Sequence, residues 1–136
     1  MQTALAVDPG REKCGVAVVS KNAGVLWQAV LPTESTVSKV AELSKDYHSD
    51  VILVGNGTSS QTMQRQLQEE FADTSIIVQT VNEYRTTDLA KIRYWQDNPP
   101  RGWRCLLPTS MQVPPVPVDD YVAIILAERY LNSRLE

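Results

Sequence analysis

The sequence predicts an α/β protein with a five-stranded mixed sheet and helices on both faces. Three short β-type runs separated by turn signals open the chain, two further apolar runs each follow a segment of helical periodicity, and an apolar helical segment comes last. The length of 136 residues, with 43% hydrophobic and 21% charged residues, is typical of one folded domain. We therefore expect a single domain over residues 1–136.

The first three strands are expected to form an antiparallel meander. Thr3–Val7 (TALAV) runs into an Asp-Pro-Gly turn, and Cys14–Ser20 (CGVAVVS) is the second run. An Asn-Ala-Gly turn then precedes Val25–Leu31 (VLWQAVL). Connections this short favour antiparallel pairing of neighbouring strands.

Two helix–strand units are predicted next. Apolar residues recur at helical spacing over 35–48, and Val51–Val54 is a continuous apolar run typical of a strand buried on both faces. Thr58, followed by glutamine three residues later, resembles a capping box and starts the second helix. Ser75–Val81 (SIIVQTV) is predicted as another buried strand.

The last part of the chain is predicted to be helical, with one irregular segment. We expect helices over 86–96 and from Asp119 to about Arg134, and six of the eight prolines fall between them, within 98–117. A meander followed by two strands added through right-handed crossovers is the element order of the ribonuclease-H-like fold.

The composition excludes several kinds of site. Two cysteines, Cys14 and Cys105, are too few for a disulfide framework or a cysteine-rich zinc site. The single histidine, His48, argues against a histidine-based triad and is expected on the surface near the end of a helix. Two unpaired thiols suit a reducing cytoplasm, and no apolar run approaches the roughly 20 residues of a membrane span. We expect a cytoplasmic protein with no membrane partner.

Four carboxylates are candidates for a metal site: Asp8, Glu83, Asp119 and Asp120. Each has a structural interpretation by itself, as a turn, loop or helix-capping residue. In the predicted fold, however, they lie at strand ends and at the start of the last helix, where they would share one cleft. Crowded carboxylates need cations, and oxygen ligands suit two Mg²⁺ or Mn²⁺ ions. Such a pair supports phosphodiester hydrolysis without histidine or cysteine.

Three segments together resemble the YqgF family, whose relatives include the RuvC Holliday-junction resolvases. They are Ala6–Ala17 (AVDPGREKCGVA), Asn82–Thr87 (NEYRTT) and Val118–Leu126 (VDDYVAIIL). The resemblance covers the whole chain in the family's order. It implies a ribonuclease-H-like fold and a metal-dependent nuclease, linked to trimming the 5′ end of precursor 16S ribosomal RNA and described by analogy as a junction resolvase.

The resemblance assigns roles to the acids. It implies that Asp8 is the first catalytic carboxylate and Glu83 the second. The third is Asp119 if the YqgF spacing to Ala123 applies, or Asp120 if the shorter RuvC spacing applies; we favour Asp119 as the metal ligand beside Asp8 and Glu83. The sequence departs from the family pattern at Asn82, where aspartate is usual, and at position 84, where tyrosine replaces the usual arginine. The loop at 55–59 (GNGTS) also departs, since the family usually has Gly-x-Pro with a longer insertion there.

Nucleic-acid contacts are expected at basic and loop positions. Although the net charge is −3, residues 85–104 hold five basic side chains against two acidic ones. The loop after Val54 could bind a phosphate through its amides or simply be a tight turn, and the Arg-Gly-Trp-Arg segment could bind bases and phosphates or lie solvated. The candidate contacts are Lys13, Asn56, Thr58, Arg85, Arg101, Trp103 and Arg104.

The leading functional hypothesis is a two-metal endonuclease that processes the 5′ end of precursor 16S ribosomal RNA. The alternatives are a Holliday-junction resolvase acting on branched DNA and a nucleic-acid-binding module without activity. A resolvase makes two symmetric cuts, so it would act as a homodimer, and the apolar last helix offers a face for one.

Overall fold

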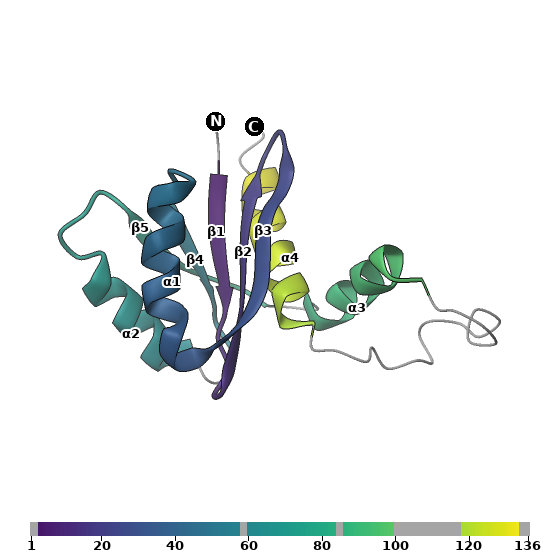
Figure 1. Ribbon diagram of the computed structural model, residues 1–136, viewed down its shortest axis with the longest axis horizontal. Coiled ribbons are helices and arrows are strands. Elements are labelled where there is room, and N and C mark those ends of the chain that lie inside the picture. Colours follow the sequence, from purple (N-terminus) through teal and green to yellow (C-terminus); the bar gives the residue numbers. More distant parts are fainter. Residues whose placement is uncertain (1–2, 58–59, 84–85, 100–117, 134–136) are drawn as a thin grey trace.

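The computed structural model describes residues 3–57, 60–83, 86–99 and 118–133, and it shows the predicted α/β architecture (Figure 1). One five-stranded sheet has the order β3-β2-β1-β4-β5. Its elements are β1 (Thr3–Asp8), β2 (Lys13–Ser20), β3 (Gly24–Pro32), α1 (Thr33–Asp46), β4 (Val51–Gly55), α2 (Ser60–Glu70), β5 (Ile77–Val81), α3 (Thr86–Asp97) and α4 (Asp119–Ser133). Within the described ranges, no helix is long and apolar enough to span a membrane.

The central strand β1 joins the two halves of the sheet. It pairs antiparallel with β2, which pairs antiparallel with β3, as the predicted meander requires. On its other side β1 pairs parallel with β4, and β4 pairs parallel with β5. The carboxyl ends of β1, β4 and β5 therefore lie at one end of the sheet, where ligands bind in open α/β sheets.

Side chains alternate along the buried strands and build one core on each face. Leu5 and Val7 of β1 face α1 and α2, together with Val16 and Val18 of β2. Ala4 and Ala6 face α4 instead, together with Ala17 of β2. These small side chains let α4 pack close to the sheet, so the backbone at its first turn lies near the strand ends.

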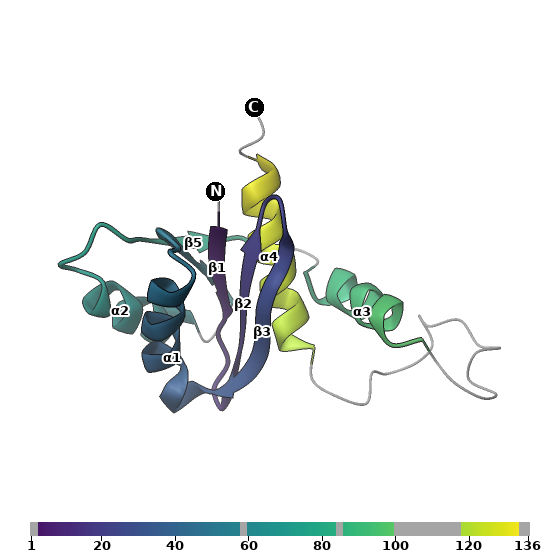
Figure 2. The ribbon, with the colours of Figure 1, turned by 45° about the horizontal axis from the view of Figure 1, so that its top comes forward.

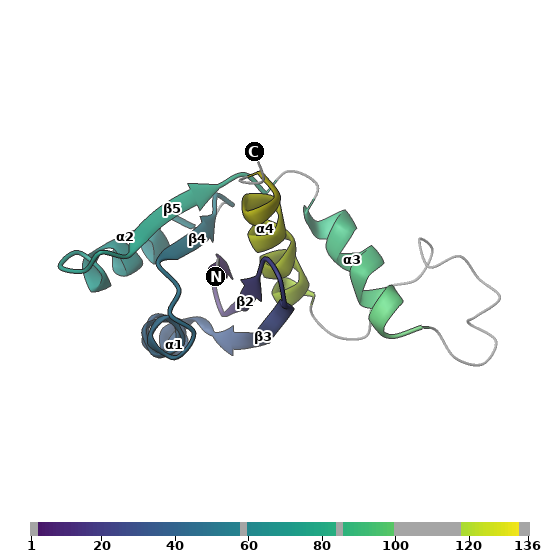
Figure 3. The same ribbon diagram turned by 90° about the horizontal axis from the view of Figure 1, so that it is seen from above.

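Helix α3 lies beyond α4 and not on the sheet (Figures 2 and 3). Tyr94 makes edge-to-face contacts with Trp95 and with Tyr121 of α4, at ring-centroid distances of 5.1 and 5.8 Å. The Arg93 guanidinium forms a 2.8 Å ion pair with Glu128 of α4. Arg93, one of the five basic residues of the predicted patch, thus holds α3 against α4.

The structure corrects the expected burial of the fifth strand. β5 begins at Ile77 and is the exposed edge of the sheet, and Ile77 itself is 62% exposed. An apolar run identifies a strand, but its burial depends on which neighbours cover it. The first helix also begins and ends two residues earlier than expected, and His48 follows it as an exposed residue with a φ of 54°. Nearly all of the proline-rich segment lies outside the described residues.

Candidate carboxylate site

The alternation of the strands places two acids on the face that α4 covers. Asp8 follows Ala4 and Ala6 by steps of two residues, so its side chain points to the same face. Val81 at the end of β5 packs against the same core, and Glu83 lies two residues beyond it. Both carboxyl groups therefore lie at the end of the sheet where α4 begins.

Glycines make room for the Glu83 carboxyl group and for the backbone at the start of α4. Gly15 lies directly opposite Asp8 in the β1–β2 pair, and a β-carbon there would overlap the Asp119 backbone carbonyl. A β-carbon on Gly55 would overlap the Glu83 carboxyl group, and one on Gly57 would lie 2.5 Å from Glu83 Oε2. The β4–α2 connection thus accommodates a carboxyl group.

The acids are close enough to change each other's protonation. Burial raises the pKa of Asp8 from 3.8 to about 9, and a hydrogen bond with Glu83 and the negative charges of Glu83 and Asp119 add to the effect. At neutral pH without a cation, Asp8 therefore keeps its proton. Burial and then the neighbouring Asp120 charge raise the pKa of Asp119, while Lys13 opposes the shift.

The Glu83 backbone is held firmly, while one of its carboxyl oxygens has no partner. The Glu83 amide donates to Asn56 Oδ1 at 3.2 Å, and its carbonyl accepts from the Thr86 hydroxyl at 2.7 Å and the Thr86 amide at 3.0 Å. Glu83 Oε1 is buried and makes no hydrogen bond. A buried carboxyl oxygen without a partner is costly, and a cation would remove that cost.

The two consecutive aspartates at the start of α4 have different surroundings. Asp119 lies close enough to raise the pKa of Asp8. Asp120 Oδ2 instead accepts a 2.9 Å hydrogen bond from Gln28 Nε2 on β3. The geometry therefore groups Asp119 with Asp8 and Glu83, and it attaches Asp120 to the meander.

The donor set fits a hard divalent cation, although it is not arranged as a finished coordination shell. Among the described residues, no three carboxyl, imidazole or thiol groups stand close enough to bind one ion as they are. Instead, burial and the neighbouring Glu83 and Asp119 raise the pKa of Asp8 to about 9, so this carboxyl keeps its proton. Loading with a cation would therefore displace this proton and draw the carboxylates together.

Only two of the predicted nucleic-acid contacts, Lys13 and Asn56, lie within the described residues. Lys13 is exposed beside Asp119, and Asn56 is exposed but its side chain contacts the Glu83 amide. The Asn56 amide donates to the Val81 carbonyl at 3.0 Å, so it is not free for a phosphate. The remaining candidates, Thr58, Arg85, Arg101, Trp103 and Arg104, lie outside the described residues.

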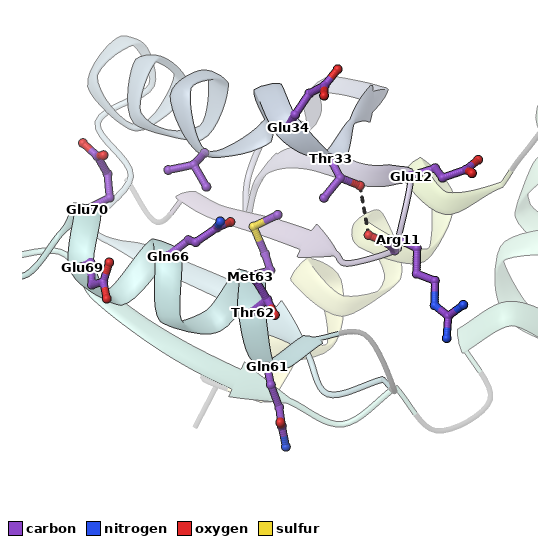
Figure 4. Close-up of a pocket in the computed structure, with 12 residues that line it drawn as sticks. Arg11, Glu12, Thr33, Glu34, Gln61, Thr62, Met63, Gln66, Glu69 and Glu70 are labelled. Carbon is purple, nitrogen blue, oxygen red and sulfur yellow. Dashed lines mark hydrogen bonds between the residues drawn. The ribbon is translucent and has the colours of Figure 1, made fainter.

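A groove of about 1120 Å³ lies elsewhere, between α1, α2 and the β1–β2 turn (Figure 4). The Thr33 hydroxyl donates to the Gly10 carbonyl at 2.9 Å at one end of it. Its lining has one basic residue, Arg11, and four acidic ones: Glu12, Glu34, Glu69 and Glu70. Acidic walls repel phosphates, so this groove does not suit nucleic acid.

Sequence reasoning missed the residues that shape the site. Gly15 is part of the Ala6–Ala17 segment, but nothing in the pattern shows that it touches Asp119. Gln28 looks like an ordinary polar residue of an edge strand. The glycines at 55 and 57 suggest a turn or a phosphate loop in the sequence, although in the structure they border the Glu83 carboxyl group.

Solved structures with the same fold have low sequence identity to this chain. RuvC of Thermus thermophilus in complex with a Holliday junction substrate aligns with a TM-score of 0.63 and 11% identity, covering 99% of this chain and 96% of that chain. The fowlpox virus Holliday junction resolvase aligns with a TM-score of 0.65 and 16% identity, covering 98% and 100%. A variant nuclease domain of the large terminase subunit of bacterial virus Sf6, with manganese, aligns with a TM-score of 0.51 and 18% identity. This alignment covers 60% of this chain and 38% of that chain.

The family assignment comes from the sequence. No curated protein matches this chain. The model of the Tex protein YqgF-like domain matches residues 2–87, more than half of the chain and a range that contains Asp8 and Glu83. The YqgF resemblance and the RuvC-like fold are thereby confirmed, and this chain belongs to the Tex protein YqgF-like domain family.

Proposed function

We propose that this protein is a divalent-metal-dependent endonuclease that cuts structured nucleic acid. The observation that carries the proposal is the convergence of Asp8, Glu83 and Asp119 beside a buried carboxyl oxygen that has no partner. The family match and the nuclease fold of the aligned structures support it. Three acids from three distant parts of the chain meet here, at a cost in repulsion that turn and capping roles do not require.

Asp8, Glu83 and Asp119 would hold the cations, and Mg²⁺ or Mn²⁺ suits their oxygen donors. A pair of such ions, when bound, lowers the pKa of water and neutralises the charge that develops on a phosphodiester. The chain itself must release the Asp8 proton before loading, because the pKa of this carboxyl is about 9 without metal. Metal affinity should therefore rise with pH up to about that value.

We propose Asp119, and not Asp120, as the third metal ligand. Asp120 already accepts a hydrogen bond from Gln28, whereas the charge of Asp119 acts on Asp8. The two substitutions Asp119→Asn and Asp120→Asn form a matched pair, because they remove the same charge from adjacent residues. Only the first should abolish cleavage, since the amide oxygen introduced by Asp120→Asn can still accept from Gln28.

Two classes of substrate fit this proposal. Trimming the 5′ end of precursor 16S ribosomal RNA is the activity that the YqgF resemblance suggests, and branched DNA is favoured by two aligned proteins that act on or bind Holliday junctions. Cutting a four-way junction symmetrically would require a homodimer. Both classes present phosphodiesters in a folded nucleic acid, so one catalytic site serves either.

The test compares cleavage of a four-way DNA junction and of an RNA with a 5′ leader, each with Mg²⁺, Mn²⁺ or EDTA. We expect metal-dependent cleavage by the wild type and by Asp120→Asn, and none by Asp8→Asn or Asp119→Asn. Light scattering with and without the junction measures the oligomeric state. Binding of either substrate without cleavage under every metal condition would favour the inactive binding module and contradict the nuclease proposal.

A further inference from the structure

The start of α4 is attached to the meander at two points. Gln28 Nε2 on β3 donates a 2.9 Å hydrogen bond to Asp120 Oδ2, between residues 92 positions apart in sequence. Gly15 on β2 lies directly under the Asp119 backbone carbonyl, where any larger side chain would overlap it. The helix therefore starts in close contact with β2 and is tied by a side chain to β3.

This attachment controls the direction of the preceding side chain. Consecutive residues of an α-helix point about 100° apart around its axis, so holding Asp120 toward β3 sets the direction of Asp119. Asp119 is then turned toward the end of β1, where its charge acts on Asp8. Rotation of the first turn would move both aspartates together.

The first turn needs such support, because the first amides of a helix lack intrahelical acceptors and helix ends fray. The Val122 amide donates to the Val118 carbonyl at 3.0 Å, which marks the start of the helical hydrogen bonds. The hydrogen bond from Gln28 to Asp120 is 2.9 Å long and partly buried. It is therefore well suited to keep the first turn in one orientation.

We propose that Gln28 is a positioning residue, which holds Asp119 in the metal site through its hydrogen bond to Asp120. This inference rests on the proposed function, since it assumes that Asp119 binds metal. Gln28 itself touches neither metal nor substrate. Its loss should weaken metal binding by about 10- to 100-fold, as is usual when a group that orients a metal ligand is removed.

A charge-neutral exchange tests the coupling. Gln28→Ala removes the donor, and Gln28→Glu places a second carboxylate against Asp120. The double variant Gln28→Glu with Asp120→Asn restores a hydrogen bond of reversed direction at the wild-type net charge. Gln79→Ala, on the other edge strand, is the matched control because Gln79 is exposed.

Two measurements keep the possible failures apart. Amide hydrogen exchange of Val122 in EDTA reports whether the first turn is held, because Val122 is the first amide of the helix with an acceptor. Mn²⁺ titration calorimetry measures metal binding at the site. We expect faster exchange and weaker Mn²⁺ binding in Gln28→Ala and Gln28→Glu, and recovery of both in the double variant. The control should match the wild type in both measurements.

Other results overturn the inference in distinct ways. Unchanged exchange in Gln28→Ala means that the hydrogen bond does not hold the turn. Faster exchange with unchanged Mn²⁺ affinity means that Gln28 anchors the helix without positioning Asp119. A wild type that binds no Mn²⁺ refutes the metal site itself, and the positioning role falls with it, whatever the exchange data show about anchoring.

Discussion

Replacing Asp8 with asparagine should stabilise the metal-free protein at neutral pH, against the usual effect of a substitution in a half-buried site. Burial, together with Glu83 and Asp119, raises the pKa of Asp8 from 3.8 to about 9. Between these values the folded protein keeps the Asp8 proton, while the unfolded chain has lost it. Unfolding then releases a proton, so the free energy of unfolding falls as pH rises through this window.

The size of the effect follows from the same shift. Each pH unit between 3.8 and 7 costs about 1.4 kcal/mol, so the penalty at pH 7 reaches about 4 kcal/mol at most. Asparagine has no such penalty, and its amide can donate to Glu83 as the protonated carboxyl does. Asp8→Asn should therefore raise the melting temperature at pH 7 by up to roughly 10 °C, and the gain should vanish near pH 4.

The assay is thermal unfolding in EDTA at several pH values, with Asp73→Asn as the control because Asp73 is exposed. Excess Mn²⁺ should then narrow the difference between the two proteins, since metal stabilises the wild type by roughly 2.7 kcal/mol at a hundredfold excess over its dissociation constant. An Asp8→Asn protein that melts below the wild type in EDTA at pH 7 would refute the crowding argument. A wild type that Mn²⁺ does not stabilise would refute the metal site.

Three further predictions concern the surroundings of the site. Gly57→Ala should push the Glu83 carboxyl group aside and weaken Mn²⁺ binding about 10-fold, with little change in melting temperature. Unchanged Mn²⁺ affinity would mean that the space beside Gly57 does not matter for the metal site. A double-mutant cycle of Arg93→Ala and Glu128→Ala, measured by urea unfolding, should give a coupling energy of about 0.5–1 kcal/mol, because both side chains are about a third exposed. Zero coupling would mean that the ion pair does not hold α3 against α4. Arg101→Ala with Arg104→Ala should weaken nucleic-acid binding and lower its logarithmic salt slope by about two, whereas an unchanged slope would mean that neither contacts phosphate.

The sequence by itself determined the elements and their order. Short β-type runs and turn residues define the meander, and helical periodicity separates it from the later strands. The same reasoning placed Asp8 and Glu83 at strand ends, because Asp8 directly follows one apolar run and Glu83 lies two residues beyond another. These features are local, since periodicity and turn residues act within a few positions of the chain.

Only the tertiary structure decided which residues meet across the sheet. β5 is apolar in sequence yet lies exposed at the edge, because burial depends on neighbours that a strand does not carry with it. Asp119 and Asp120 are equivalent as acids at a helix start, and the packing of α4 on Gly15 separates them. The rotation of that helix turns one aspartate toward Asp8 and the other toward Gln28, and such a rotation is set by contacts between segments about a hundred residues apart.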